Sequence, residues 1–179
     1  MKKDWITLFD GKEYEFLSNF YPCSIEYEGL VYPTTEHAFQ AAKTHDKIKR
    51  ELIANCATPG DAKRMGRKVE LRGDWEEVKD SVMLKVLRIK FKDEKLRGKL
   101  LATGNAMLIE DTRWHDNWWG VCNCEKCPGV GKNMLGTLLM QVRQEIRNEV
   151  RTEDTVKAGC PICGSSCPFG TGEDPCNGA

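Results

Sequence analysis

The sequence lacks an excess of charge of either sign, because its 27 Lys and Arg residues balance its 27 Asp and Glu residues. A general nucleic-acid-binding protein needs a basic excess that displaces counterions from the phosphate backbone. The zero net charge therefore removes the usual electrostatic case for such a protein and disfavours long nucleic acid as a substrate. It leaves room for a small basic pocket that binds one phosphate or diphosphate.

Long hydrophobic runs are also lacking, and none approaches the roughly 18 residues that a membrane-spanning helix needs. The basic start, Met1–Lys3, is not followed by an apolar stretch of about 7–15 residues, as a secretory signal would require. We therefore expect a protein with no membrane partner and a cytoplasmic location.

Cysteine, in contrast, is abundant, with nine residues in 179. In a reducing compartment thiols are more often buried, metal-bound or catalytic than paired as disulfides. Two Cys-x-x-Cys pairs, Cys124 with Cys127 and Cys160 with Cys163, predict a closed tetrahedral zinc site with a structural role. Free thiols and disulfides are the alternatives. Other cysteines could replace a member of this set: Cys122, Cys167 and Cys176.

A change in composition near Val150 divides the chain into a domain, residues 1–150, and a Cys-rich tail, residues 151–179. Of the 21 residues from 159 onward, twelve are Gly, Cys or Pro. The segment has too few large apolar side chains to form a core of its own. The tail is therefore expected to be either flexible or pinned by metal.

Within the domain, apolar spacing and capping residues predict mostly helices. Helices are expected over about 34–43, from 58, over 74–91, from 96 to 104, and from 133 to 150. Short strands are expected as a hairpin over 24–32, which Pro33 should end, and at 107–109. The predicted fold class is α+β, predominantly helical with a few short strands, in a single domain plus the tail.

The helix predicted from Thr34 presents an acid, an amide and an amine on one face. Glu36, Gln40 and Lys43 follow one another at spacings of four and three residues. One interpretation is a catalytic face; the other is that Glu36 satisfies backbone N–H groups at the helix start and Lys43 is a solvated lysine.

Residues 110–120 contain three of the five tryptophans, Trp114, Trp118 and Trp119, among acids and a histidine. The segment is a poor helix and a poor strand, so we expect a loop. Such a loop can wall a pocket for a planar ligand, or its rings can plug one end of the core.

Three further residues are candidates for binding phosphate. Arg64 and Arg67 lie three apart on one helix, where they could bind an anion or form surface salt bridges. Asn133 lies at a helix start after a glycine-containing loop, which can bind an anion through backbone N–H groups. A plain loop-to-helix junction is the simpler explanation. The three histidines show no regular metal-ligand spacing.

Several of these segments, taken in order, resemble the NADAR family, also called the YbiA-like proteins. The resemblance extends over about residues 5–148 and leaves out the tail. It rests on motifs in segments 16–22, 32–43, 58–67, 74–83, 100–104, 119–120 and 131–140.

The resemblance implies an N-glycosidase that hydrolyses the C1–N bond of a ribosylated base. Its substrate would be either ADP-ribose on guanine or a riboflavin-pathway intermediate that carries ribose 5-phosphate. Glu36 would be the central acid, Lys43 a second catalytic group on the same helix, and Asp116 a catalytic residue in the opposite wall. The residues expected to bind substrate are Asn19, Phe20, Arg64, Arg67, Trp119, Gly120 and Asn133.

No cofactor is expected for catalysis, and the expected metal is a structural zinc. The partner would be a phosphorylated ribosyl or ADP-ribosyl substrate, including ADP-ribosylated nucleic acid; the sequence predicts no oligomeric state. The alternative function is a non-catalytic module that binds ADP-ribose or NAD.

Overall fold

The computed structural model describes residues 4–7 and 13–157 of the chain. It divides into two compact units, Met1–Gln144 and Glu145–Ala179, with the boundary inside the last helix. The helices are η1 Glu15–Leu17, α1 Thr35–Ala41, α2 Lys47–Ala54, α3 Pro59–Gly66, α4 Trp75–Lys90, α5 Glu94–Ala102 and α6 Met134–Lys157. The strands are β1 Trp5–Ile6, β2 Pro22–Tyr27, β3 Leu30–Thr34, β4 Met107–Leu108, β5 Asp111–Thr112 and β6 Val121–Cys122. The α+β, mainly helical class is confirmed.

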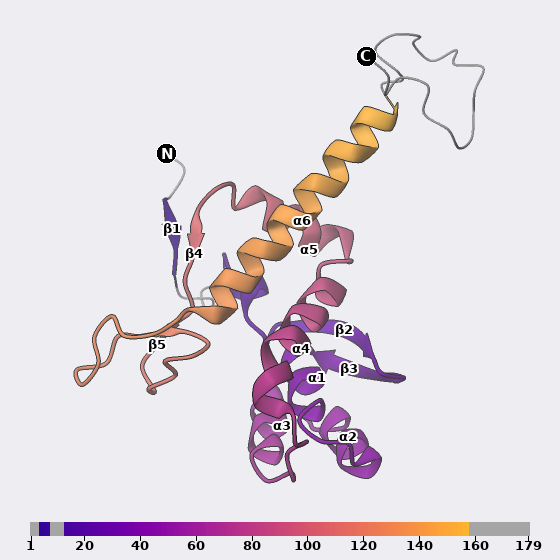
Figure 1. Cartoon of the computed structure of the whole chain (residues 1–179), viewed down its shortest axis with the longest axis vertical. Helices are drawn as coiled ribbons and strands as arrows, with labels where there is room; N and C mark the ends of the chain where they lie inside the picture. Colours follow the sequence, from indigo (N-terminus) through magenta and orange to yellow (C-terminus); the bar gives the residue numbers. More distant parts are fainter. Residues whose placement is uncertain (1–3, 8–12, 158–179) are drawn as a thin grey trace. The chain divides into compact units, whose positions relative to one another are not determined.

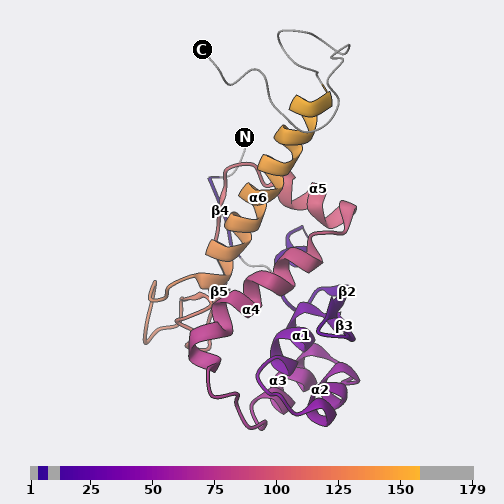
Figure 2. The ribbon, with the colours of Figure 1, turned by 45° about the vertical axis from the view of Figure 1, so that its right-hand side comes forward.

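Helix α1 occupies the centre of the first unit. Thr34 caps it, since the Thr34 hydroxyl accepts a hydrogen bond from the His37 backbone N–H. All seven residues of α1 are buried. The helix contacts α2, α3, α4 and the β2–β3 hairpin, and these elements surround it in Figures 1 and 2. A polar side chain on α1 is therefore either bonded internally or directed into a cavity.

The strands form three separate pairs within the described residues. β2 and β3 are antiparallel, whereas β1 pairs with β4 and β5 with β6 in parallel. The expectation that Pro33 ends the hairpin is wrong, because Pro33 lies inside β3 and the strand continues to Thr34. A proline is tolerated at the edge of a sheet, where its missing N–H costs no ladder bond.

Among the described residues, no helix has the length and apolar character that crossing a membrane requires.

Close packing of α3 on α1 depends on Gly66. A Cβ atom at Gly66 would lie 2.1 Å from Oε1 of Gln40. Glycine at this position lets the backbone of α3 approach α1 and fixes the side chain of Gln40.

The end of α4 contains a buried cation that faces the segment before β2. Lys90 is 1% exposed, and its Nζ donates a 2.7 Å hydrogen bond to the carbonyl oxygen of Ser18. Nζ also lies 5.7 Å from the ring centroid of Tyr21 and 5.5 Å from that of Phe91. Burial lowers the pKa of Lys90 to about 8, although the nearby Cys23 thiol opposes this shift. Lys90 thus ties the end of α4 to Ser18.

Because of this lowered pKa, the stability contributed at Lys90 is expected to rise with pH. Below pH 8 both the folded and the unfolded chain carry the Lys90 proton. Between pH 8 and 10.5 the unfolded chain retains a proton that the folded chain has released, so unfolding becomes less favourable. We expect the free energy of unfolding, measured with urea, to increase between pH 8 and 10.5 by up to about 3 kcal/mol more in wild type than in Lys90→Met. A difference independent of pH would contradict the lowered pKa.

Candidate active site

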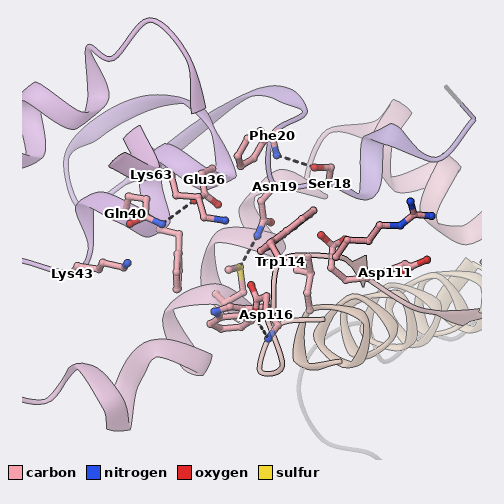
Figure 3. Close-up of a pocket in the computed structure, with 16 residues that line it drawn as sticks. Ser18, Asn19, Phe20, Glu36, Gln40, Lys43, Lys63, Asp111, Trp114 and Asp116 are labelled. Carbon is pink, nitrogen blue, oxygen red and sulfur yellow. Dashed lines mark hydrogen bonds between the residues drawn. The ribbon is translucent and has the colours of Figure 1, made fainter. Parts of the chain in front are cut away.

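A cavity of about 640 Å³ opens beside α1 in the first unit (Figure 3). Its walls come from residues 18–20, α1, α3, α4, residues 110–119 and the start of α6. The lining residues are Ser18, Asn19, Phe20, Glu36, Phe39, Gln40, Lys43, Lys63, Met83, Glu110, Asp111, Arg113, Trp114, Asp116, Trp119 and Leu135. This volume lies in the range typical of small-molecule sites.

Glu36 is a nearly buried carboxyl group on the α1 wall of this cavity. It is 5% exposed, and its Oε1 accepts a 2.8 Å hydrogen bond from Nε2 of Gln40. Burial raises the pKa of Glu36; Lys63, Gln40 and Lys43 oppose the shift. The backbone N–H of Glu36 donates to the carbonyl oxygen of Asn19 at 2.9 Å, so the α1 start and the Asn19 wall are held together.

Lys43, in the turn that follows α1, and Lys63, on α3, bring two amines to the same cavity. Burial lowers the pKa of Lys43, the neighbouring charges of Lys63 and Arg67 lower it further, and Glu36 opposes them. Lys63 lies close enough to lower the pKa of Glu36, and Figure 3 shows its amine directed toward Glu36. The cavity therefore contains a carboxyl group with a raised pKa, that of Glu36, and an amine with a lowered pKa, that of Lys43.

The opposite wall is built from the tryptophan-rich segment. Oδ1 of Asp116 accepts a 2.9 Å hydrogen bond from the backbone N–H of Trp119, closing a short turn. The Trp119 ring contacts Phe39 of α1 edge-on, with centroids 5.2 Å apart and planes at 83°. Trp118 points elsewhere, because its Nε1 donates to Asp80 of α4 at 3.0 Å. Trp114 and Trp119 thus line the cavity, and Trp118 docks the segment onto α4.

Two acceptor atoms of lining residues have no hydrogen-bond partner among the described residues. They are Oδ1 of Asn19 and Oε1 of Gln40, both buried. Nδ2 of Asn19 donates to the thioether sulfur of Met83 at 3.5 Å, which is a weak bond. Leaving a buried acceptor unbonded costs about 1–3 kcal/mol.

The structure brings six of the predicted catalytic and substrate-binding residues to the cavity: Asn19, Phe20, Glu36, Lys43, Asp116 and Trp119. Four others do not line it. Arg64 forms an ion pair with Asp61, and Arg67 caps the end of α3, where its charge still acts on Lys43. Both arginines therefore remain a prediction as phosphate ligands, without support from the cavity lining.

Gly120 and Asn133 have structural contacts, and their predicted contacts with substrate stay a prediction. Oδ1 of Asn133 accepts from the Glu110 backbone N–H at 3.0 Å, and Nδ2 donates to the Leu108 carbonyl at 2.8 Å. Its side chain is therefore engaged with the backbone that precedes β5. A Cβ atom at Gly120 would lie 2.5 Å from the carbonyl oxygen of Glu110, so glycine permits close backbone packing there.

Several lining residues were not singled out as site residues from the sequence. Lys63 lies on the helix that suggested the arginines, and Arg113 and Trp114 lie in the predicted loop. Gln40 was placed on the catalytic face without a role. The clearest available signal was the spacing of Lys63, four residues before Arg67 on the same helical face.

The structure groups two of the four predicted metal ligands with two residues outside the predicted set. His115, Cys122, Cys124 and Cys127 place their ligand atoms within 4.8 Å of one another and could hold a metal ion. Cys124 and Cys127 belong to the predicted set, whereas Cys160 and Cys163 lie outside the described residues. His115 and Cys122 complete a four-ligand cluster without them.

Comparison with known proteins identifies a family and a solved structure that this chain resembles. The NADAR domain model matches residues 8–147. The N-glycosidase YbiA of Escherichia coli is 44% identical over 140 residues, which cover 76% of this chain and 84% of that protein. A riboflavin biosynthesis protein of Vibrio vulnificus is 37% identical over 135 residues, covering 74% of this chain and 35% of that protein. The NMR structure of E. coli YbiA superposes with a TM-score of 0.72 at 40% identity, covering 84% of this chain and 90% of that one. These matches in sequence and structure show that the chain belongs to the NADAR domain family.

Proposed function

We propose that the protein is an N-glycosidase that hydrolyses the C1–N bond of a ribosylated base, with Glu36 and Lys43 as its reacting side chains. The observation that carries this proposal is the cavity itself. It brings together a buried carboxyl group with a raised pKa, an amine with a lowered pKa and a wall of indole rings. The N-glycosidase class is supported by the name of YbiA of E. coli, which is 44% identical over 140 residues.

The two pKa shifts favour an acid–amine mechanism. A raised pKa makes a carboxyl group keep its proton to higher pH, and a lowered pKa makes an amine neutral and nucleophilic at lower pH than usual. Glu36 would protonate the ribose ring oxygen, opening the ring as a C1 iminium. The Lys43 amine would then add to C1, and the base would leave with a proton. Water would hydrolyse the Lys43 Schiff base, releasing the free sugar and restoring the amine.

A direct route uses the same cavity without the lysine adduct. Breaking the C1–N bond develops oxocarbenium character on the ribose, which an ionised Glu36 would stabilise. The same carboxylate would orient the attacking water, and Asp116 or a lysine would assist departure of the base. The lowered pKa of Lys43 is the observation that favours the Schiff-base route over this one.

Two substrate classes are candidates for this cavity, and each has its own support. A ribose 5-phosphate intermediate of riboflavin synthesis is supported by the name of the Vibrio relative. ADP-ribose on guanine, free or in nucleic acid, is supported by the cavity mouth. There Phe20 is 43% exposed and Trp114 is 59% exposed, and Nζ of Lys63 lies 5.9 Å from each ring centroid. Two exposed rings beside a cation suit a second stacked base and a diphosphate.

The proposal is tested by measuring release of free base from both substrate classes by the purified full chain. We expect chromatography to detect base release from at least one class, and the faster class identifies the substrate. Phe20→Ala should slow turnover of the ADP-ribosylated substrate more than that of the ribose 5-phosphate compound, because the mouth contacts the longer ligand. If the protein turns over neither class but binds ADP-ribose or NAD in calorimetry, it is the non-catalytic binding module instead.

A further inference from the structure

The four-residue cluster beside the active-site wall has the distances of a closed metal site. Nδ1 of His115 lies 3.2 Å from Sγ of Cys127 and 3.6 Å from Sγ of Cys124, and the two sulfurs are 3.5 Å apart. The remaining ligand atom belongs to Cys122 and lies within 4.8 Å of the other three. All three cysteines are free thiols.

These separations match the edges of a tetrahedron around zinc. Zinc bonds of about 2.3 Å to sulfur and about 2.0–2.1 Å to nitrogen imply sulfur–sulfur edges of about 3.8 Å and sulfur–nitrogen edges of about 3.6 Å. A set of three thiolates and one imidazole is typical of structural zinc sites, and soft thiolate ligands exclude magnesium and calcium. Four protein ligands leave no open position, so the site is structural and not catalytic.

The backbone around the cysteines is folded into a tight turn that presents their sulfurs to one point. The N–H of Cys122 donates to the carbonyl of Val130 at 2.8 Å, and the N–H of Gly129 donates to the carbonyl of Cys122 at 2.9 Å. Gly129 has a φ of +73°, which glycine adopts without strain. Cys122 itself is fully buried at the end of β6.

His115 reaches this turn from the other side of the active-site segment. Its φ of +62° is unusual for a residue with a side chain and requires support from its surroundings. A bond from His115 to the metal would supply that support. Asp116 is the next residue, and Trp119 lies three residues after it. A metal held by His115 and Cys122 would therefore close the short loop that carries Asp116 and Trp119.

We propose that His115, Cys122, Cys124 and Cys127 bind one structural zinc ion that fixes the Asp116–Trp119 wall of the cavity. The ion anchors both ends of the loop, the first through His115 and the second through the end of β6. The tail cysteines take no part in this site. The proposal concerns a site next to the cavity and does not depend on which reaction the cavity performs.

Metal content of the full chain, expressed with added zinc and purified without chelator, tests the ligand set. Mass spectrometry of the metal should find that Cys124→Ser with Cys127→Ser removes one zinc per chain, whereas Cys56→Ser and the pair Cys160→Ser with Cys163→Ser remove none. His115 is exposed, so His115→Ala should fold and weaken zinc binding at least about ten-fold in competition with a chromogenic chelator. Zinc-free wild type, or loss of the ion from the Cys160 and Cys163 variant, would overturn the proposal.

Limited trypsin digestion tests the structural consequence. Arg113 and Lys126 are exposed and flank the loop and the turn. A zinc-selective chelator should speed cleavage at these two sites at least about ten-fold, because a segment without its metal opens more often. Cleavage at Lys92, exposed after α4, should not change. Equal rates at Arg113 and Lys126 with and without chelator would show that no ion holds this wall.

Discussion

Replacing Glu36 with glutamine is expected to lower the rate of base release at least about 10³-fold, because the amide can neither give a proton nor carry negative charge. The substitution should leave the fold intact. Glutamine keeps an acceptor oxygen for Nε2 of Gln40. A neutral amide also avoids the cost of burying a charge, so the melting temperature should equal or exceed that of wild type. Single-turnover base release and thermal unfolding measure the two effects.

Glu77→Gln is the matched control, since Glu77 is an exposed carboxylate on α4 outside the cavity. It should retain wild-type activity under the same conditions. If Glu36→Gln released base at the wild-type rate, Glu36 would have no part in the chemistry, and the assignment of the cavity as an active site would lose its central residue.

Replacing Lys43 with methionine is expected to reduce base release by about 10²-fold or more, since it removes the amine that would attack C1. The Schiff-base route predicts a further result. Borohydride added during turnover should reduce the imine, so that wild type gains the mass of one reduced sugar on the peptide containing Lys43. Lys43→Met should gain none.

The control for this experiment is Lys92→Met, which removes an exposed lysine that does not line the cavity. It should behave as wild type in both rate and trapping. Turnover by wild type without any trapped adduct would exclude the Schiff-base route. Glu36 and water would then carry the reaction, and Lys43 would act only through its charge.

Much of the fold could be predicted because its signals are local. Thr34 and Thr58 cap their helices as the sequence indicates, and the broad apolar face over 74–91 appears as α4. Helix α2 was not predicted; Ile53 is its one buried residue, and its other large apolar side chains, Ile48 and Leu52, are exposed. The pairs β5–β6 and β1–β4 are two residues long, and tertiary contacts determine them more than sequence pattern does.

The site was predictable only where one element carries it. Glu36 and Lys43 belong to one predicted helix, whose spacing places them on one face, and both line the cavity although α1 ends at Ala41, two residues before Lys43. The phosphate candidates illustrate the limit. Successive helical residues differ in direction by about 100°, so Lys63 lines the cavity while the next residue, Arg64, pairs with Asp61. Composition identifies a basic helix, but packing decides which of its cations faces the ligand.

The metal ligands show the same limit for loops. The Cys124 and Cys127 pair is recognisable from spacing, and Cys122 is two residues away. His115 is not recognisable, because its approach depends on a positive φ that the sequence does not indicate. A ligand contributed by a non-repeating turn becomes visible only in three dimensions.

The complete burial of α1 decides where the enzyme could be re-engineered for new ligands. None of its seven residues faces solvent, so random libraries over 35–41 would mostly yield insoluble chains. Phe20 and Trp114, in contrast, are exposed at the mouth and carry little of the core. Variation directed at these two positions should shift ligand preference while the reacting groups and the melting behaviour stay as they are.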